Sequence, residues 1–368
     1  MIALDAAVTA NNFALQVLWF VLIAVLWIGY LVLEGFDYGV AMLVPFLAKD
    51  EKERRVMVNT IGPVWDGNEV WLLTAGGATF AAFPAWYATL FSGLYLPLFL
   101  VLVGLIVRGV AFEYRAKHPD TKWRTTFDWM ACIGSFVVTL VFGVGFANFI
   151  IGLPVVAAPG SNHLMMLETP FYFLPLFNGF ALLGGVTLVA LFVFHGSTFL
   201  SLKTKGDLHD RIVAFNKTAG LVAIGLGAVF LLWQQFIHPT GLLGWALLVL
   251  AALGLAGAWW FVQAGREGIA FISSSAAVLF VAVGIFATMF PGLGFRASGK
   301  GFATDGAAAV AQGLQLTTAS STDATLILMS IVAVVFVPIV LAYTAWTYWV
   351  FRKRLGVENM PDEVALAS

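Results

Sequence analysis

The residues best suited to chemistry are two pairs of carboxylates that interrupt apolar segments. Glu34 and Asp37 lie in LEGFDYGVAML, and Asp66 and Glu69 lie in VWDGNEVWLL. Each pair is spaced i, i+3, which places both carboxylates on one face of a helix. A charged carboxylate near the centre of a bilayer costs about 2.5–3.5 kcal/mol, so such residues face the protein interior and usually serve a function.

The depth of these carboxylates favours proton exchange. Asp37 is ten residues before the predicted helix end at Leu47, or about 15 Å at 1.5 Å per residue. Asp66 is eleven residues after Arg55, or about 16 Å. Like charges this close in a low dielectric cannot all ionise, so at least one carboxyl should take up and release protons. We expect Arg108, near the inner end of the third predicted helix, to be their charge partner.

The composition indicates the elements that position these groups. The 368 residues are 61% hydrophobic and 11% charged, with a net charge of −1. Apolar stretches of roughly 20 residues recur, each long enough to cross a hydrocarbon core of about 30 Å. A spanning backbone must satisfy its own hydrogen bonds, so helices are expected. We predict an all-α, polytopic membrane protein, and the charge balance gives no sign of nucleic-acid binding.

Nine transmembrane helices are predicted in one integral membrane domain, residues 1–368. The N-terminal segment MIALDAAVTANN lacks a positively charged region, so we expect no cleavable signal peptide. The approximate helix bounds are 14–47, 56–82, 86–112, 127–152, 171–200, 212–236, 242–263, 269–290 and 324–351.

The basic residues predict the orientation. Most lysines and arginines follow the first, third, fifth, seventh and ninth helices, whereas Arg296 and Lys300 lie in a loop on the other side. Short basic loops remain in the cytoplasm. The N-terminus is therefore predicted outside and the C-terminus in the cytoplasm.

The histidines argue against haem or metal ligation by this chain. Of five histidines, only His195 lies within a predicted helix. A haem needs an axial ligand such as histidine or methionine, and no second histidine is placed to pair with His195 across helices. We expect His195 to pack in the core, and we expect no haem ligand and no metal site. Grooves lined by phenylalanine and leucine would suit an isoprenoid tail.

The segment GPVWDGNEVWLLTAGGATFAAFP (62–84) closely resembles subunit II of the cytochrome bd quinol oxidases. Three other segments agree with that family: LEGFDYGVAML (33–43), KWRTTFDWMACIGSF (122–136) and VPIVLAYTAWTYWVFRKR (337–354). The resemblance covers nearly the whole chain. It implies two four-helix bundles plus one peripheral helix, in a bacterial cell membrane. It also implies a heterodimer with a haem-bearing subunit I, in contact with quinone and lipids and with room for a small accessory subunit.

The resemblance further implies a role in respiration. The family's subunit I carries haems b558, b595 and d and oxidises quinol, and the complex reduces O2 to water with protons taken from the cytoplasm. Subunit II helps to form a proton-entry path and can hold a structural quinone at a membrane-facing surface. The family's proton-path aspartate corresponds to Asp66 and the preceding tryptophan to Trp65. Glu34 and Asp37 match the family's acidic pair, with Glu34 where aspartate is often found, and Glu69 is expected to assist Asp66.

Two other interpretations remain open at this stage. A proton-coupled secondary transporter would use buried carboxylates equally well, but transporters commonly show broken helices in two related halves. Here the acids gather in the first two predicted helices only. A purely structural scaffold for a haem-bearing partner would tolerate neutralisation of all four acids without kinetic cost.

Overall fold

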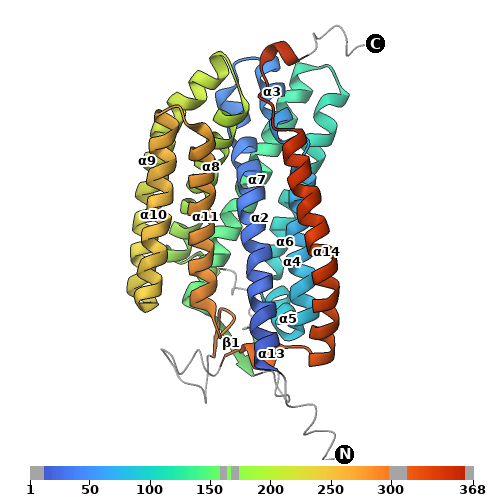
Figure 1. Ribbon diagram of the computed structural model, residues 1–368, viewed down its shortest axis with the longest axis vertical. Coiled ribbons are helices and arrows are strands. Elements are labelled where there is room, and N and C mark those ends of the chain that lie inside the picture. Colours follow the sequence, from blue (N-terminus) through green and yellow to red (C-terminus); the bar gives the residue numbers. More distant parts are fainter. Residues whose placement is uncertain (1–11, 158–163, 167–173, 298–312, 361–368) are drawn as a thin grey trace, which may run out of the picture.

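The chain forms an elongated bundle of long helices (Figure 1). The computed structural model describes residues 12–157, 164–166, 174–297 and 313–360. The N-terminal segment for which no signal peptide is expected lies almost wholly outside these residues. The long helices are α2 (Phe13–Leu47), α4 (Trp65–Ala82), α6 (Tyr95–Tyr114), α7 (Thr121–Ile151), α8 (Gly179–Lys203), α9 (Asp207–Ile237), α10 (Gly241–Gln263), α11 (Glu267–Met289) and α14 (Asp323–Val350).

Helix α2 runs through the middle of the bundle and packs against α4, α7, α8 and α11. In Figure 1, α8 to α11 lie on one side of α2, and α4, α6 and α14 lie on the other. Helix α14 is peripheral, because most of its side chains are exposed and it packs mainly on α2 and α4. Most buried apolar side chains form one large cluster that reaches across these helices, with two smaller clusters beside it, as expected when each helix buries one stripe of side chains.

Eight helices in the described part of the chain are long and apolar enough to cross a membrane. This finding confirms the prediction of an all-α polytopic membrane protein. The second predicted helix, 56–82, is divided into α3 (Glu51–Ile61) and α4. Pro63 lies at the break, and because proline lacks an N–H it cannot donate to the carbonyl of Asn59 and continue the helical ladder. Helix α4 is not among the eight, because its polar residues lower its mean hydropathy. The count of nine transmembrane helices and the orientation of the chain therefore stay predictions.

Other helix bounds also differ from the sequence prediction. The predicted helix 86–112 is divided into α5 (Pro84–Gly93) and α6. Pro97 cannot donate to the carbonyl of Gly93, which interrupts the ladder of hydrogen bonds there. Helix α7 begins at Thr121 rather than at 127, because the Asp120 side chain accepts a hydrogen bond from the N–H of Lys122 and caps the helix.

A small sheet closes the end of the bundle at which α2 begins (Figure 1). Its strands lie in segments that were predicted as loops, and the strand order is β2-β1-β3. Strand β1 pairs antiparallel with β2, with Val155 opposite Met166, and parallel with β3, with Leu153 opposite Phe295. The remaining elements are β1 (Leu153–Ala157), β2 (Leu164–Met166), β3 (Phe295–Ala297), α13 (Leu316–Ala319) and three short 3-10 helices, Arg115–Lys117, Leu174–Phe177 and Val357–Asn359.

A network of ion pairs ties the other end of the bundle together. Arg115 lies 2.9 Å from Glu51 of α3 and 2.5 Å from Asp128 of α7. Arg124 lies 3.3 Å from Glu51, and Arg54 lies 3.4 Å from Asp128. Because two acids are shared among three arginines, the network joins α3, α6 and α7 where α6 ends.

Candidate functional site

A buried arginine gathers two of the predicted carboxylates. Arg108 Nη1 of α6 pairs with Glu34 of α2 and lies 2.8 Å from Glu69 Oε1 of α4. The side chains of Arg108 and Glu34 are fully buried, whereas Glu69 keeps 26% of its side chain exposed. The three side chains come from three helices, so their contacts fix the junction of α2, α4 and α6.

Aromatic rings enclose the arginine. The guanidinium carbon of Arg108 lies 4.5 Å from the ring centre of Tyr38, 5.2 Å from that of Phe112 and 5.9 Å from that of Trp65. These are cation–π distances. The Tyr38 hydroxyl is hydrogen-bonded to that of Tyr30, and both tyrosines are fully buried. The rings keep water away from the guanidinium, which strengthens its attraction to the carboxylates.

Asp37, beside this group, is held by hydrogen bonds from Asn68 and, through Asn68, from Tyr348, two residues that the sequence did not single out. Asn68 Nδ2 donates to Asp37 Oδ2 at 2.7 Å and to the Leu33 carbonyl at 3.3 Å. The hydroxyl of Tyr348 in α14 donates to Asn68 Oδ1 at 3.0 Å. Asn68 could have been noticed because it is a polar residue next to Glu69, whereas Tyr348 is 280 positions away and carries no local signal.

The structure separates Asp66 from the other three predicted carboxylates. Its side chain is exposed and accepts a hydrogen bond from the N–H of Gly67 at 2.7 Å. Helix α4 begins at Trp65, so Asp66 lies in the first turn, where free N–H groups and the helix dipole favour a carboxylate. Trp65 is half-buried, with its ring centre 5.2 Å from that of Phe112. It thus lies between the exposed Asp66 and the buried arginine.

We call Glu34, Asp37, Glu69 and Arg108 the Arg108 cluster. It contains three carboxyl groups and one guanidinium, and Asp37 interacts electrostatically with the other three members. Full ionisation would leave excess negative charge in a buried site, and burial of unpaired charge costs several kcal/mol. The cluster therefore has the composition needed to hold a proton on a carboxyl group and to release it.

His195 lies in a separate polar contact between helices. Its Nδ1 is 2.8 Å from Ser274 Oγ of α11, and its Nε2 is 3.0 Å from the Val32 carbonyl of α2. The ring stacks on that of Phe271, with 5.1 Å between the ring centres. Both ring nitrogens thus have protein partners, as in a core histidine that links helices.

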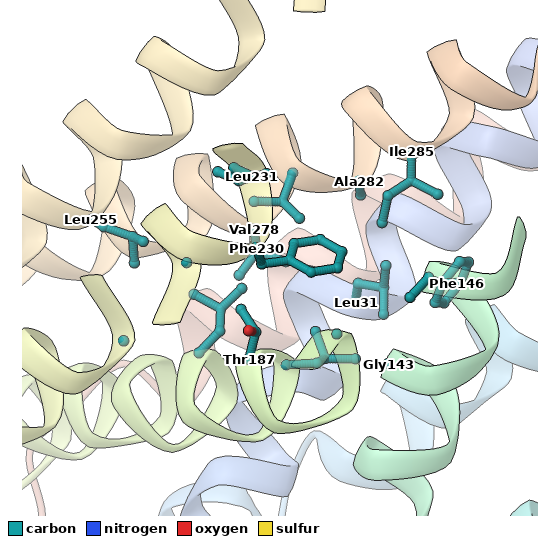
Figure 2. A pocket seen from close by; sticks show the side chains of 17 residues that line it. Leu31, Gly143, Phe146, Thr187, Phe230, Leu231, Leu255, Val278, Ala282 and Ile285 are labelled. Carbon is teal, nitrogen blue, oxygen red and sulfur yellow. The ribbon is translucent and has the colours of Figure 1, made fainter. Parts of the chain in front are cut away.

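An apolar cavity lies between α2 and the helices α7 to α11 (Figure 2). Its volume is about 40 Å³, and Thr187 is the one side chain with a polar atom among the residues that line it. Ordered water needs two to four polar partners. The cavity is therefore suited to an apolar occupant rather than to water, and it lies apart from the residues of the Arg108 cluster.

Fold and site together define a multi-pass helical membrane protein with an ionisable cluster inside its bundle. The family model for cytochrome bd terminal oxidase subunit II matches residues 15–351. Cytochrome bd ubiquinol oxidase subunit 2 of Bacillus subtilis (strain 168) is 38% identical over 347 residues, covering 93% of this chain and 97% of that protein. Cytochrome bd-I ubiquinol oxidase subunit 2 of Escherichia coli (strain K12) is 36% identical over 383 residues, covering 94% of this chain and 96% of that protein.

A solved structure agrees in fold. A chain of the bd oxidase from Geobacillus thermodenitrificans matches with a TM-score of 0.70 at 14% identity, over 92% of this chain and 98% of that one. The chain belongs to the cytochrome bd terminal oxidase subunit II family. It is a multi-pass protein of the bacterial inner membrane and one subunit of a terminal quinol oxidase, which favours the oxidase interpretation over the transporter one.

Proposed function

We propose that this chain supports a haem-bearing subunit I and forms part of the route by which cytoplasmic protons reach the site of O2 reduction in that subunit. The observation that carries the proposal is the Arg108 cluster, in which three carboxyl groups from two helices share one buried guanidinium. A structural ion pair needs one acid. The additional acids allow the site to bind protons, which a purely structural ion pair would not need to do.

The exposure of the acidic side chains to solvent decreases from Asp66 toward the buried part of the Arg108 cluster. Asp66 is exposed, Glu69 keeps 26% of its side chain exposed, and Glu34 and Asp37 are fully buried. Asp66 and Glu69 are one helical turn apart, so a proton taken up at Asp66 has a short distance to cover. Trp65 and Phe112 line this step and limit the access of water to it.

The surface around Asp66 supports the heterodimer. On the same helix, Val70 is 51% exposed and Leu73 is 73% exposed. A carboxylate beside such apolar side chains is poorly placed against lipid tails, because exposure to hydrocarbon is costly for a charge. We propose that subunit I covers this part of α4, which brings Asp66 to the boundary between the subunits.

The haems b558, b595 and d are proposed to bind subunit I, with no axial ligand from this chain. His195→Gln tests this point. The glutamine side chain retains a hydrogen-bond donor and an acceptor, so we expect a loss of about 1–3 kcal/mol in stability from imperfect hydrogen bonds. We expect no change in the haem absorption bands of the purified complex. Loss of one haem band at unchanged subunit stoichiometry would show that His195 is a ligand.

A structural quinone is proposed at a membrane-facing apolar surface of this chain. The cavity of about 40 Å³ in Figure 2 is too small for an isoprenoid tail, so the proposal rests on the large apolar side chains exposed on the outer faces of the helices. Extraction of the purified complex with organic solvent would test it, because a bound quinone should be recovered in stoichiometric amount.

Asp66→Asn tests the proton route directly. Because Asp66 is exposed and forms no hydrogen bond or ion pair with the Arg108 cluster in the described part of the chain, we expect the variant to assemble with a full haem complement. We expect its rate of quinol-dependent O2 consumption to fall by at least about tenfold, and by up to the roughly 10²- to 10⁴-fold that a proton-transfer residue contributes. The rate is measured with an oxygen electrode on the purified complex and normalised to haem content.

Glu113→Gln is the matched control, since Glu113 is an exposed carboxylate near the end of α6. It should respire at the normal rate. A fully haem-loaded Asp66→Asn complex with normal respiration would contradict the proposed route. Normal respiration after neutralisation of all four predicted acids would instead favour a purely structural scaffold.

A further inference from the structure

The side-chain amide of Asn68 has an orientation that its neighbours determine. The carbonyl of Leu33 can only accept a hydrogen bond, so the amide atom that faces it, at 3.3 Å, must be the nitrogen. The same nitrogen donates to Asp37 Oδ2 at 2.7 Å. The amide oxygen then faces Tyr348, whose hydroxyl must donate to it. The chain of hydrogen bonds therefore runs in one direction, from Tyr348 through Asn68 to Asp37.

This direction assigns different roles to the two oxygens of Asp37. Oδ2 is held as an acceptor by the amide of Asn68. Oδ1 is buried and has no hydrogen-bond partner within the described residues. A proton on Asp37 must therefore lie on Oδ1. The amide cannot pass a proton onward, because an uncharged carboxamide does not gain or lose a proton under ordinary conditions.

Tyr348 brings the peripheral helix into contact with this group. Helix α14 is largely exposed, but Tyr348 is half-buried and its ring centre lies 6.4 Å from that of Phe36, one residue before Asp37. The titratable and charged groups around Asp37 are Glu34 on its own helix, Glu69 on α4, Arg108 on α6 and the Tyr348 hydroxyl on α14. Of these, only Tyr348 acts through the amide of Asn68.

We infer that Asn68 and Tyr348 are positioning residues that hold Asp37 Oδ2 as a fixed acceptor and so restrict proton exchange at Asp37 to Oδ1. The inference rests on the proposed proton route. The inference assigns a specific role to α14, because Tyr348 on that helix donates the hydrogen bond that holds the amide oxygen of Asn68. It also implies that no proton enters the Arg108 cluster from the α14 side, since the amide lies between Tyr348 and Asp37.

The test compares Tyr348→Phe with Tyr343→Phe in the complete purified complex. Both variants remove one hydroxyl from α14, but Tyr343 is 64% exposed. Loss of the donor leaves the amide oxygen of Asn68 without its partner, so the amide is held less firmly against Asp37, by the Leu33 carbonyl and Asp37 itself. We expect kcat for quinol oxidation to fall about two- to tenfold in Tyr348→Phe, the range for one lost hydrogen bond, with KM for quinol unchanged. Tyr343→Phe should match the wild-type complex in both constants.

An infrared measurement reports on Asp37 itself. The redox-induced infrared difference spectrum of the complex should contain a carboxyl C=O band that Asp37→Asn removes. That band should shift in Tyr348→Phe and in Asn68→Leu and stay in place in Tyr343→Phe. A structural role for Tyr348 that did not involve Asp37 would leave the band unmoved.

The outcomes separate this inference from the proposed function. If Asp37→Asn lowers turnover but Tyr348→Phe alters neither kcat nor the band, the positioning role is wrong and the proton route stands. If neither Asp37→Asn nor Asp66→Asn lowers turnover in haem-loaded complexes, the route itself is wrong. A fall in kcat together with a rise in KM in Tyr348→Phe would indicate a general disturbance of the complex and would also overturn the positioning role.

Discussion

Arg108→Gln should prevent the chain from accumulating as a folded subunit. The substitution removes the single guanidinium that the buried Glu34 and the half-buried Glu69 share. Removal of one partner from a buried ion pair costs about 3–5 kcal/mol, because the remaining charge has no compensation. That loss is a large fraction of the roughly 5–15 kcal/mol by which proteins are stable. We expect little or no complex in detergent extracts and, where some is recovered, a clearly lower Tm.

A second substitution distinguishes uncompensated charge from lost packing. Glu34→Gln in the Arg108→Gln background removes the buried acid as well, so yield and Tm should recover in part. Arg352→Gln is the control, since Arg352 is exposed and stacks over Trp349 at 4.4 Å. Yield is measured as haem per milligram of membrane protein. A normal yield and Tm for Arg108→Gln alone would show that the cluster is already neutral without the arginine.

The sequence indicated which residues gather at this site more fully than it indicated their geometry. Residue types and the i, i+3 spacing were sufficient to select Glu34, Asp37 and Glu69 and to suggest Arg108, because charged residues are rare in apolar helices. The separate position of Asp66 was not predicted. It depends on where α4 begins, and the predicted helix 56–82 runs through Pro63 although proline lacks the N–H that a continuous helix needs.

Long-range contacts account for most of what the sequence did not show. The hydroxyl of Tyr348 reaches Asn68 only because α14 packs on α2 and α4. The contact of His195 with Ser274 similarly joins helices that are 79 positions apart in the chain. Neither pair has a local pattern, so propensity and periodicity cannot find it. The short strands β1 and β3 were missed for the same reason, since their parallel pairing joins two distant loops.

Gly39→Ala should also be strongly destabilising, although it adds a single methyl group. Helices α2 and α8 touch through their backbones at this position. A Cβ atom on Gly39 would lie 1.9 Å from the carbonyl oxygen of Phe192 and 2.9 Å from Cα of Gly196. Backbone atoms cannot rotate away, so the helices must separate, and overpacking of this kind costs about 1–3 kcal/mol or more. The separation would also disturb Asp37, two residues before Gly39 in α2.

Gly225→Ala is the matched control for this prediction. Gly225 lies within α9, and nothing lies within 4 Å of the position that its Cβ would occupy. There the same substitution should raise stability by roughly 0.5–1 kcal/mol, because alanine favours helix over glycine. Thermal unfolding of the purified complexes would therefore give shifts of opposite sign for two identical substitutions. Equal Tm values for both variants would mean that α2 and α8 are not in backbone contact in the assembled oxidase, and that the position of Asp37 does not depend on that contact.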